Sequence, residues 1–301
     1  MNLQTARRCA TAAGLLMLAV PTWAGSQIEK TLKLNPGGRF VLEADEGSVD
    51  LMGSDQSGVS VVISGENDDF QNRVDLSFEE EGDTVRIRER RRYWDLFDFL
   101  FDPLGLHYQI RVPKSTTLEI RTGGGSIRVY SMAGDTDLKT SGGSIEVSTV
   151  TGDVHAYTSG GHIRAEQIHG ELQVRTSGGG IEANSIDGAL TAKTSGGPIR
   201  IDGVTGRVDA RTSGGSIEAI FSKGNQGGGT LETSGGSIHA RIDPAVNLDV
   251  DASSSGGGVS SNLPIRGDGW NSRDVLHGTL GLGGNVLRLH TSGGGVRVDA
   301  L

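Results

Sequence analysis

Three consecutive segments decide the fold: residues 140–157 read TSGGSIEVSTVTGDVHAY, residues 158–175 read TSGGHIRAEQIHGELQVR, and residues 176–193 read TSGGGIEANSIDGALTAK. Each has 18 residues and begins with Thr-Ser-Gly-Gly. A fixed period is the signature of a repeat protein, in which one short unit stacks on the next. The same start recurs as Thr-Gly-Gly-Gly at Thr122, at the same interval at Thr194 and Thr212, and after longer intervals at Thr233, Ser254 and Thr291. We interpret the longer intervals as loop insertions that leave the register intact.

Apolar residues recur within each repeat at positions 5, 7, 10, 14 and 16 after the threonine, as in Ile145, Val147, Val150, Val154 and Ala156. A spacing of two is typical of a strand with one buried face, so each repeat contains two short strands. The glycine at position 12 and the Gly-Gly pair lie between strands, where we expect turns with positive φ. One such unit cannot bury its apolar side alone. The sequence therefore predicts an all-β fold, a parallel two-sheet β-solenoid (β-helix) of 18-residue coils.

Charges alternate in sign at position 6, through Arg128, Glu146, Arg164, Glu182, Arg200 and Glu218, before His239. Residues stacked in register on neighbouring strands lie ~4.8 Å apart, where opposite charges attract and like charges repel. The alternation therefore predicts that Arg164 lies beside both Glu146 and Glu182.

The rest of the chain divides around these repeats. Residues 25–121 lack the period but contain several short alternating segments. We expect them to start the solenoid and to form an irregular N-terminal β cap, because an uncovered end exposes unpaired backbone groups. Residues 122–301 then form the solenoid repeats, with an inserted loop at about 262–277.

Residues 1–24 have the features of a signal peptide: Arg7 and Arg8, then an apolar run at 12–20, then small residues around Ala24. The only cysteine, Cys9, lies within them, and their removal takes the formal net charge from -9 to -11. An acidic chain does not favour nucleic acid as a partner. No later stretch approaches the ~20 apolar residues of a transmembrane helix. We expect a periplasmic protein or, alternatively, a secreted or cell-surface one.

The chain resembles the adhesin-like family of β-strand repeat proteins that is named domain of unknown function 4097. The resemblance rests on Gly-Ser-Val-Asp-Leu at 47–51, Ile-Arg-Val-Pro at 110–113, the Ser-Gly-Gly repeats, Gly-Thr-Leu-Gly at 278–281, and residues 287–297. It implies a β-helical fold and, from the family's name, adhesion. It carries over no catalytic residue, since fold likeness alone does not give function.

An acidic column is the first candidate site. Asp135, Asp153 and Glu171 occupy position 13 of successive repeats, with Asp137 and His155 two residues further on. Stacked carboxylates repel unless something neutralises them, and a divalent cation would do so. The alternative is a solvated acidic face, relieved by Lys139 and Arg175 on the same strands. We expect no cofactor.

An aromatic and basic segment is the second candidate. It comprises Tyr93, Trp94, Phe97, Phe99 and Phe101, with Arg90, Arg91 and Arg92 beside them. One interpretation is a loop or short helix that folds over the solenoid's end and buries its rings. The other is an exposed patch that contacts a membrane surface or a protein partner.

These features favour a non-catalytic, exported envelope protein, a binding or structural scaffold of adhesin-like type. Its partner would be an envelope protein, a glycan or peptidoglycan. A second hypothesis is a carbohydrate-active β-helix enzyme that uses Asp135, Asp153, Glu171 and His155, although the common catalytic motifs are missing. A third is ice binding by the threonine array, against which the threonines' expected burial at a corner argues.

Overall fold

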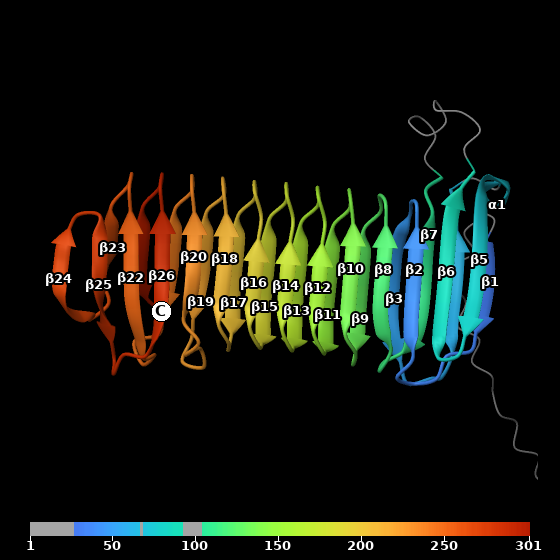
Figure 1. The fold of residues 1–301 in the computed structure, drawn as a ribbon, viewed down its shortest axis with the longest axis horizontal. Coiled ribbons are helices and arrows are strands. Elements are labelled where there is room, and N and C mark those ends of the chain that lie inside the picture. Colours follow the sequence, from blue (N-terminus) through green and yellow to red (C-terminus); the bar gives the residue numbers. More distant parts are fainter. Residues whose placement is uncertain (1–26, 67–68, 93–103) are drawn as a thin grey trace, which may run out of the picture.

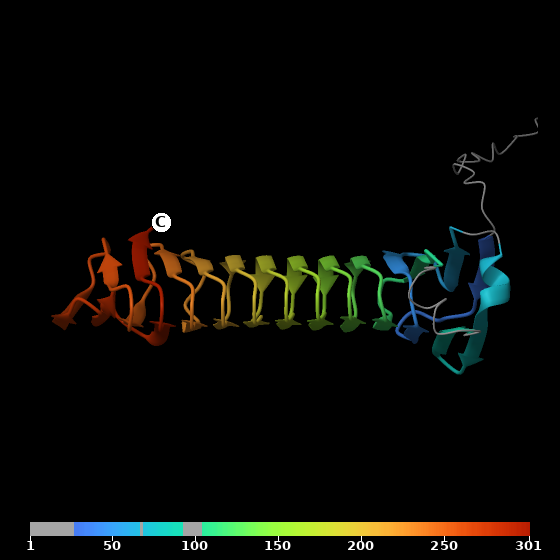
Figure 2. The ribbon, with the colours of Figure 1, turned by 90° about the horizontal axis from the view of Figure 1, so that it is seen from above.

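The computed structural model describes residues 27–66, 69–92 and 104–301, and shows a long molecule built from two sheets (Figure 1). Within these residues, sheet A has 13 strands and sheet B has 14. The sheets lie face to face as two layers along the molecule (Figure 2). The α-helix of the described residues, α1 (Phe70–Arg73), lies at the N-terminal end (Figure 1). The chain is therefore all-β.

Along most of the chain, two strands that are hydrogen-bonded neighbours in a sheet are not consecutive in the sequence. In spatial order, sheet A contains β1 (Gln27–Leu32), β4 (Val59–Ser64), β7 (His107–Pro113), β3 (Ser48–Ser54), β9 (Ile127–Met132), β11 (Ile145–Thr151), β13 (Ile163–His169), β15 (Ile181–Asp187), β17 (Ile199–Val204), β19 (Ile217–Phe221), β21 (Ile238–Ile242), β27 (Val296–Ala300) and β23 (Val259–Ser261). In the same order, sheet B contains β5 (Val74–Glu81), β6 (Thr84–Arg91), β2 (Arg39–Ala44), β8 (Thr117–Thr122), β10 (Thr136–Thr140), β12 (Val154–Tyr157), β14 (Leu172–Arg175), β16 (Leu190–Lys193), β18 (Val208–Thr212), β20 (Gly229–Thr233), β26 (Asn285–Thr291), β22 (Leu248–Ser254), β25 (Val275–Leu280) and β24 (Arg266–Ser272).

The central strands pair in parallel, and each residue pairs with the one 18 positions later. In sheet A, Ile145 pairs with Ile163, and Ile163 pairs with Ile181. In sheet B, Leu172 pairs with Leu190. The chain crosses from one sheet to the other after every strand between β8 and β21, so that one strand in each sheet makes one turn of the stack.

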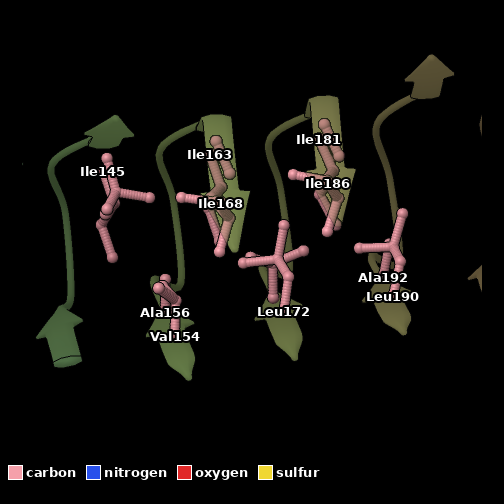
Figure 3. Close-up of a cluster of buried hydrophobic side chains, with 14 of the residues drawn as sticks. Ile145, Val154, Ala156, Ile163, Ile168, Leu172, Ile181, Ile186, Leu190 and Ala192 are labelled. Carbon is pink, nitrogen blue, oxygen red and sulfur yellow. The ribbon is translucent and has the colours of Figure 1, made fainter. Parts of the chain in front are cut away.

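The core is a single thin layer between the sheets. Side chains from both sheets point into it, as Ile163 and Ile168 of sheet A and Leu172 of sheet B show (Figure 3). All three are fully buried. Alanine occupies several inward positions, including Ala165 and Ala183, both of which are also buried. The hydrophobic contact area per turn is therefore small and is repeated many times.

Each of five successive sheet A strands, from β9 to β17, has an extra residue at the same position, so the strands stay in register with one another. The inward side chains skip from position 7 to position 10, for example from Val147 to Val150. The residue at position 9 adopts positive φ, as at Thr149, where φ is 57°. The same position holds Ser131, Gln167 and Ser185, and then Gly203, all with positive φ. A left-handed residue adds one position to the strand, which explains why the period of two breaks within each repeat.

The threonine that opens each repeat is buried at one corner, as expected, and its hydroxyl joins two turns of the stack. Thr158 is fully buried, and its Oγ1 donates a hydrogen bond of 2.7 Å to the carbonyl oxygen of Gly143 in the preceding turn. Oγ1 of Thr158 also accepts the N–H of Gly161 at 3.4 Å. The donated bond recurs at Thr122, Thr140, Thr176, Thr194, Thr212, Thr233, Thr291 and Ser254.

The second glycine of each Thr-Ser-Gly-Gly is required for a reason other than the one the sequence suggested. We expected positive φ, but Gly161 does not have it. A Cβ on Gly161 would instead lie 2.1 Å from the carbonyl oxygen of Gly143. A Cβ on Gly160 would lie 3.3 Å from the carbonyl oxygen of Gly142. Of the two glycines, the second is therefore where the backbones of successive turns approach more closely, and only hydrogen fits between them.

The C-terminal end does not follow sequence order. A stack in sequence order would place the Ser254 repeat directly on the Thr233 repeat, but the structure places the Thr291 repeat between them. Thr233 pairs with Thr291, and Thr291 pairs on its other side with Ser254. The last two strands, β26 and β27, therefore lie between earlier ones, and the C-terminus lies inside the stack (Figure 1). The segment expected as a loop at about 262–277 contains β24 and the start of β25, which pair in antiparallel fashion.

The N-terminal end has the same kind of crossing. Strand β2 lies between β6 and β8, and β3 lies between β7 and β9. Strands β1 and β5 are the outermost strands of the two sheets at this end, and both pair in antiparallel fashion. An early turn is thus enclosed between two later ones.

The corner threonines should contribute to stability through their hydroxyl groups. Thr158→Val keeps the shape of the side chain but leaves the Gly143 carbonyl and the Gly161 N–H without this partner. We expect a loss of about 1 to 3 kcal/mol in the free energy of unfolding, measured by urea denaturation with circular dichroism. Thr151→Val, the same change at an exposed strand position, should alter it by less than about 0.5 kcal/mol. Equal losses in the two variants would contradict the corner's role.

Candidate binding surface

Two of the three carboxylates in the acidic column accept backbone N–H groups. Oδ1 of Asp135 accepts the N–H of Asp153 at 3.0 Å, and Oδ1 of Asp153 accepts the N–H of Glu171 at 2.8 Å. Glu171 in turn accepts a hydrogen bond of 2.8 Å from the amide of Gln173. Each aspartate therefore joins its own turn to the next. The residues that the structure describes include no group of three or more His, Cys, Asp or Glu side chains arranged to hold a metal ion.

The aromatic residues of the second candidate, Tyr93, Trp94, Phe97, Phe99 and Phe101, lie outside the described residues. The arginines before them are described, and each has an acidic partner. Arg90 pairs with Asp45 at 2.9 Å, and Arg91 with Glu46 at 3.2 Å. Arg92 pairs with Asp75. Only 4% of the Arg91 side chain is exposed, so Arg91 is not a surface contact. In the described part of the chain, no helix has the length and apolar character to span a bilayer.

A buried carboxyl lies beneath these arginines. Glu89 is fully buried, and its Oε2 accepts the N–H groups of Asp45 at 2.8 Å and Glu46 at 3.3 Å. Burial raises the pKa of Glu89 to about 7; the two backbone hydrogen bonds oppose the rise, and the charges of Asp45 and Glu46 add to it. Its Oε1 and the hydroxyl of Tyr108 are both buried without a hydrogen-bond partner among the described residues.

The outer face of sheet A carries a ladder of alternating charge. Arg164 pairs with Glu146 on one neighbouring strand and with Glu182 on the other, and its guanidinium lies 3.3 Å from the Glu182 carboxylate. Further pairs are Arg128 with Glu146 at 3.7 Å and Arg200 with Glu218 at 3.9 Å. This face neutralises its own charges.

The outer face of sheet B carries a row of positive charge. The row is formed by the residue that precedes the corner threonine on each of six neighbouring strands, β8 to β18. In order, the residues are Arg121, Lys139, Tyr157, Arg175, Lys193 and Arg211, and each pairs in register with the next. We call the five cations the basic row. No acid interrupts it, in contrast to the ladder on sheet A.

In the described part of the chain, acidic partners are present only at the two ends of the basic row. Arg121 lies 2.9 Å from Glu119, and Arg211 lies 2.7 Å from Glu232. Among the described residues, the three central cations, Lys139, Arg175 and Lys193, make no ion pair. The ammonium of Lys139 lies over the ring of Tyr157, 5.5 Å from its centroid. A hydrogen bond with Ser159 lowers the pKa of the exposed Tyr157 hydroxyl, and the charges of Arg175 and Lys139 lower it further.

Three shallow hollows follow the basic row along sheet B. The central hollow is lined by all of the row except Arg211. It shares Arg121 and Lys139 with a hollow that reaches Arg90 toward the N-terminal end. It shares Arg175 and Lys193 with a hollow that reaches Arg288 toward the C-terminal end. The hollows therefore form one continuous open groove, which we call the sheet B groove.

Sequence reasoning missed this surface. It noted Lys139 and Arg175 only as relief for the acidic column. The signal was present, because the basic row is found by aligning the last residue of each repeat, in the same way that the sheet A ladder is found at position 6. With Arg90 at its end, the groove also includes one residue of the second candidate.

Comparison with protein families gives one assignment. The model of the Toastrack DUF4097 family matches residues 39–299, which is most of the chain. The chain belongs to the Toastrack family. A comparison with curated proteins gives no match.

Solved structures similar to this Toastrack chain include three named as binding or adhesion proteins. A "putative adhesin" from Bacteroides fragilis is 10% identical, with a TM-score of 0.44, 92% of this chain covered and 97% of the other. A "putative lipid binding protein" from Parabacteroides distasonis is 12% identical, with a TM-score of 0.42, 92% of this chain covered and 98% of the other. A "putative cell adhesion protein" from Clostridium sporogenes is 12% identical, with a TM-score of 0.23, 92% of this chain covered and 100% of the other.

The buried Glu89 predicts a pH dependence of stability. The folded chain holds this proton up to a pH of about 7, whereas the unfolded chain releases it near the ordinary value of 4.5. The stability that the fold gains from protonated Glu89 is therefore complete below pH 4.5. It falls as the pH rises to about 7 and stays low above that pH. Glu89→Gln removes the titration.

Between pH 5 and pH 8 the wild type should therefore lose more of its free energy of unfolding than Glu89→Gln does. Because the pKa rises from 4.5 to about 7, this extra loss between the two pH values should be about 2 to 3 kcal/mol. Urea denaturation at the two pH values measures it. A difference between the two proteins that is the same at both pH values would show that Glu89 titrates normally.

Proposed function

We propose that this chain is a non-catalytic binding protein of the bacterial cell envelope that holds an extended partner along the sheet B groove. In this proposal residues 1–24 are a signal peptide and the mature chain is periplasmic. Residues 25–121 cap a rigid solenoid of 18-residue coils, which presents the groove. The observation that carries the proposal is the continuity of the three hollows over one flat, regular face.

The shape of the groove favours a long ligand over a small one. Small-molecule sites are concave and enclose most of the ligand. The sheet B groove is open and shallow and runs across successive strands, so it can contact many repeating units of a partner at once. The outer face of sheet A, where opposite charges already pair, offers less to a charged partner.

A structural role for the acidic column favours binding over catalysis. Oδ1 of Asp135 and Oδ1 of Asp153 each accept a backbone N–H of the next turn, which fixes both side chains in the stack. The threonine array likewise has its hydroxyls in use at a buried corner, which disfavours ice binding.

The test is selective blocking of each face. Cys9 is the only cysteine and lies in the expected signal peptide, so the mature chain can be labelled at one introduced thiol. Gln173→Cys places a polyethylene glycol maleimide in the groove, and Asp202→Cys places it on the exposed face of sheet A. Wild type should sediment with isolated envelope material, and the label at 173 alone should abolish this. Failure of wild type to sediment, or equal loss from both labels, would contradict the proposal.

A further inference from the structure

The basic row places like charges side by side on neighbouring strands. Like charges directly opposite on neighbouring strands are destabilising. The sheet A ladder shows that this chain can place opposite charges on successive strands. Sheet B instead stacks Arg175 beside Lys193 and Lys193 beside Arg211, in a chain with net charge -9. An anionic partner would neutralise the row.

From this pattern we infer that the sheet B groove binds a linear acidic polysaccharide, with carboxylate groups of successive sugars along the basic row. The inference rests on the proposed function and names the class of its ligand. The three central cations, Lys139, Arg175 and Lys193, make the principal contacts, because the two end cations are already paired with acids.

The spacing of the row does not match an extended peptide. Neighbouring strands lie ~4.8 Å apart, so one such step separates Arg175 from Lys193, and two steps separate Lys139 from Arg175, with Tyr157 between them. An extended peptide rises ~3.3 Å per residue and presents side chains on one face only at every second residue, so its carboxylates fall out of step with these cations.

The side chains next to the row suit sugars. A second outward row, two residues earlier on each strand, holds Asp137, His155, Gln173 and Thr191 in the central hollow. The side chains of the last three donate and accept hydrogen bonds, as sugar hydroxyls require, and the Asp137 carboxylate accepts them. Tyr157 interrupts the cations and offers a ring face for the apolar side of a sugar.

Two other anionic partners fit less well. Single-stranded nucleic acid binds to several aromatic platforms, and Tyr157 is the one aromatic residue in the central hollow. A membrane surface would require apolar side chains beside the cations. The exposed large hydrophobic residues of the described chain are Met52, Leu282, Val286 and Leu301, none of which lies on β8 to β18.

The experiment measures binding to immobilised polygalacturonate, which has one carboxylate per sugar, by biolayer interferometry. The matched ligand control is the same polymer with its carboxylates methyl-esterified. The protein variant is the triple substitution K139Q/R175Q/K193Q, and its matched control is R128Q/R164Q/R200Q, which removes three cations from sheet A.

Wild type should bind the acidic polymer and not the ester, more weakly as ionic strength rises. The sheet B triple variant should lose about tenfold or more in affinity, and the sheet A variant less than about twofold. The inference is overturned if wild type ignores polygalacturonate or if both triple variants lose equally. It is also overturned if polyglutamate, single-stranded DNA or phosphatidylglycerol vesicles bind more tightly.

Circular dichroism and urea denaturation of both triple variants establish that each is folded. The sedimentation experiment separates this inference from the proposed function. The sheet B triple variant could still sediment with envelope material while the label at 173 prevents sedimentation. The groove would then bind a partner through contacts other than these three cations. That result would overturn the acidic ligand and leave the proposed function standing.

Discussion

The close approach of successive backbones at one corner is the constraint on which this fold depends. At Gly161 a Cβ would lie 2.1 Å from the carbonyl oxygen of Gly143, so the corner admits only glycine. The same carbonyl accepts the hydroxyl of Thr158, so both of these groups have a hydrogen-bond partner at the corner. Threonine and glycine thus form one unit that sets the stacking distance and direction. This register aligns the side chains of the sheet A ladder, the acidic column and the basic row.

At both ends of the stack, strands from one turn lie between strands of other turns. A sequential stack loses its last turn most easily, because that turn has one neighbour. Here the last strands, β26 and β27, have neighbours on both sides, as do β2 and β3 near the start. Opening the turn that holds the C-terminus therefore requires breaking two parallel interfaces. The outermost strands of the two sheets are β1 and β5 at one end and β23 and β24 at the other. Of these, β1, β5 and β24 pair in antiparallel fashion, and β23 pairs in parallel with β27.

Sequence alone was sufficient to predict the two-strand repeat, its inward face and the charge neighbours of Arg164, because all three follow from a regular period. It was insufficient for the order of the ends, because spacing cannot show whether Thr291 stacks before or after Ser254. It predicted where glycine is needed but gave the wrong reason at Gly161, where the limit is space and not φ. The acidic column was visible as a pattern, but its carboxylates bind backbone N–H groups that no pattern reveals. The basic row could have been found by aligning the last residue of each repeat, but it was overlooked.

Adjacent glycines provide the most direct test of the corner. Gly160→Ala and Gly161→Ala add the same methyl group one residue apart, but the first meets a carbonyl at 3.3 Å and the second at 2.1 Å. The free energy of unfolding from urea denaturation should fall by several kcal/mol more for Gly161→Ala than for Gly160→Ala, since overpacking against rigid backbone costs about 1 to 3 kcal/mol or more. Equal losses for the two variants, or a Gly161→Ala protein as stable as wild type, would show that backbone contact at this corner does not set the stack.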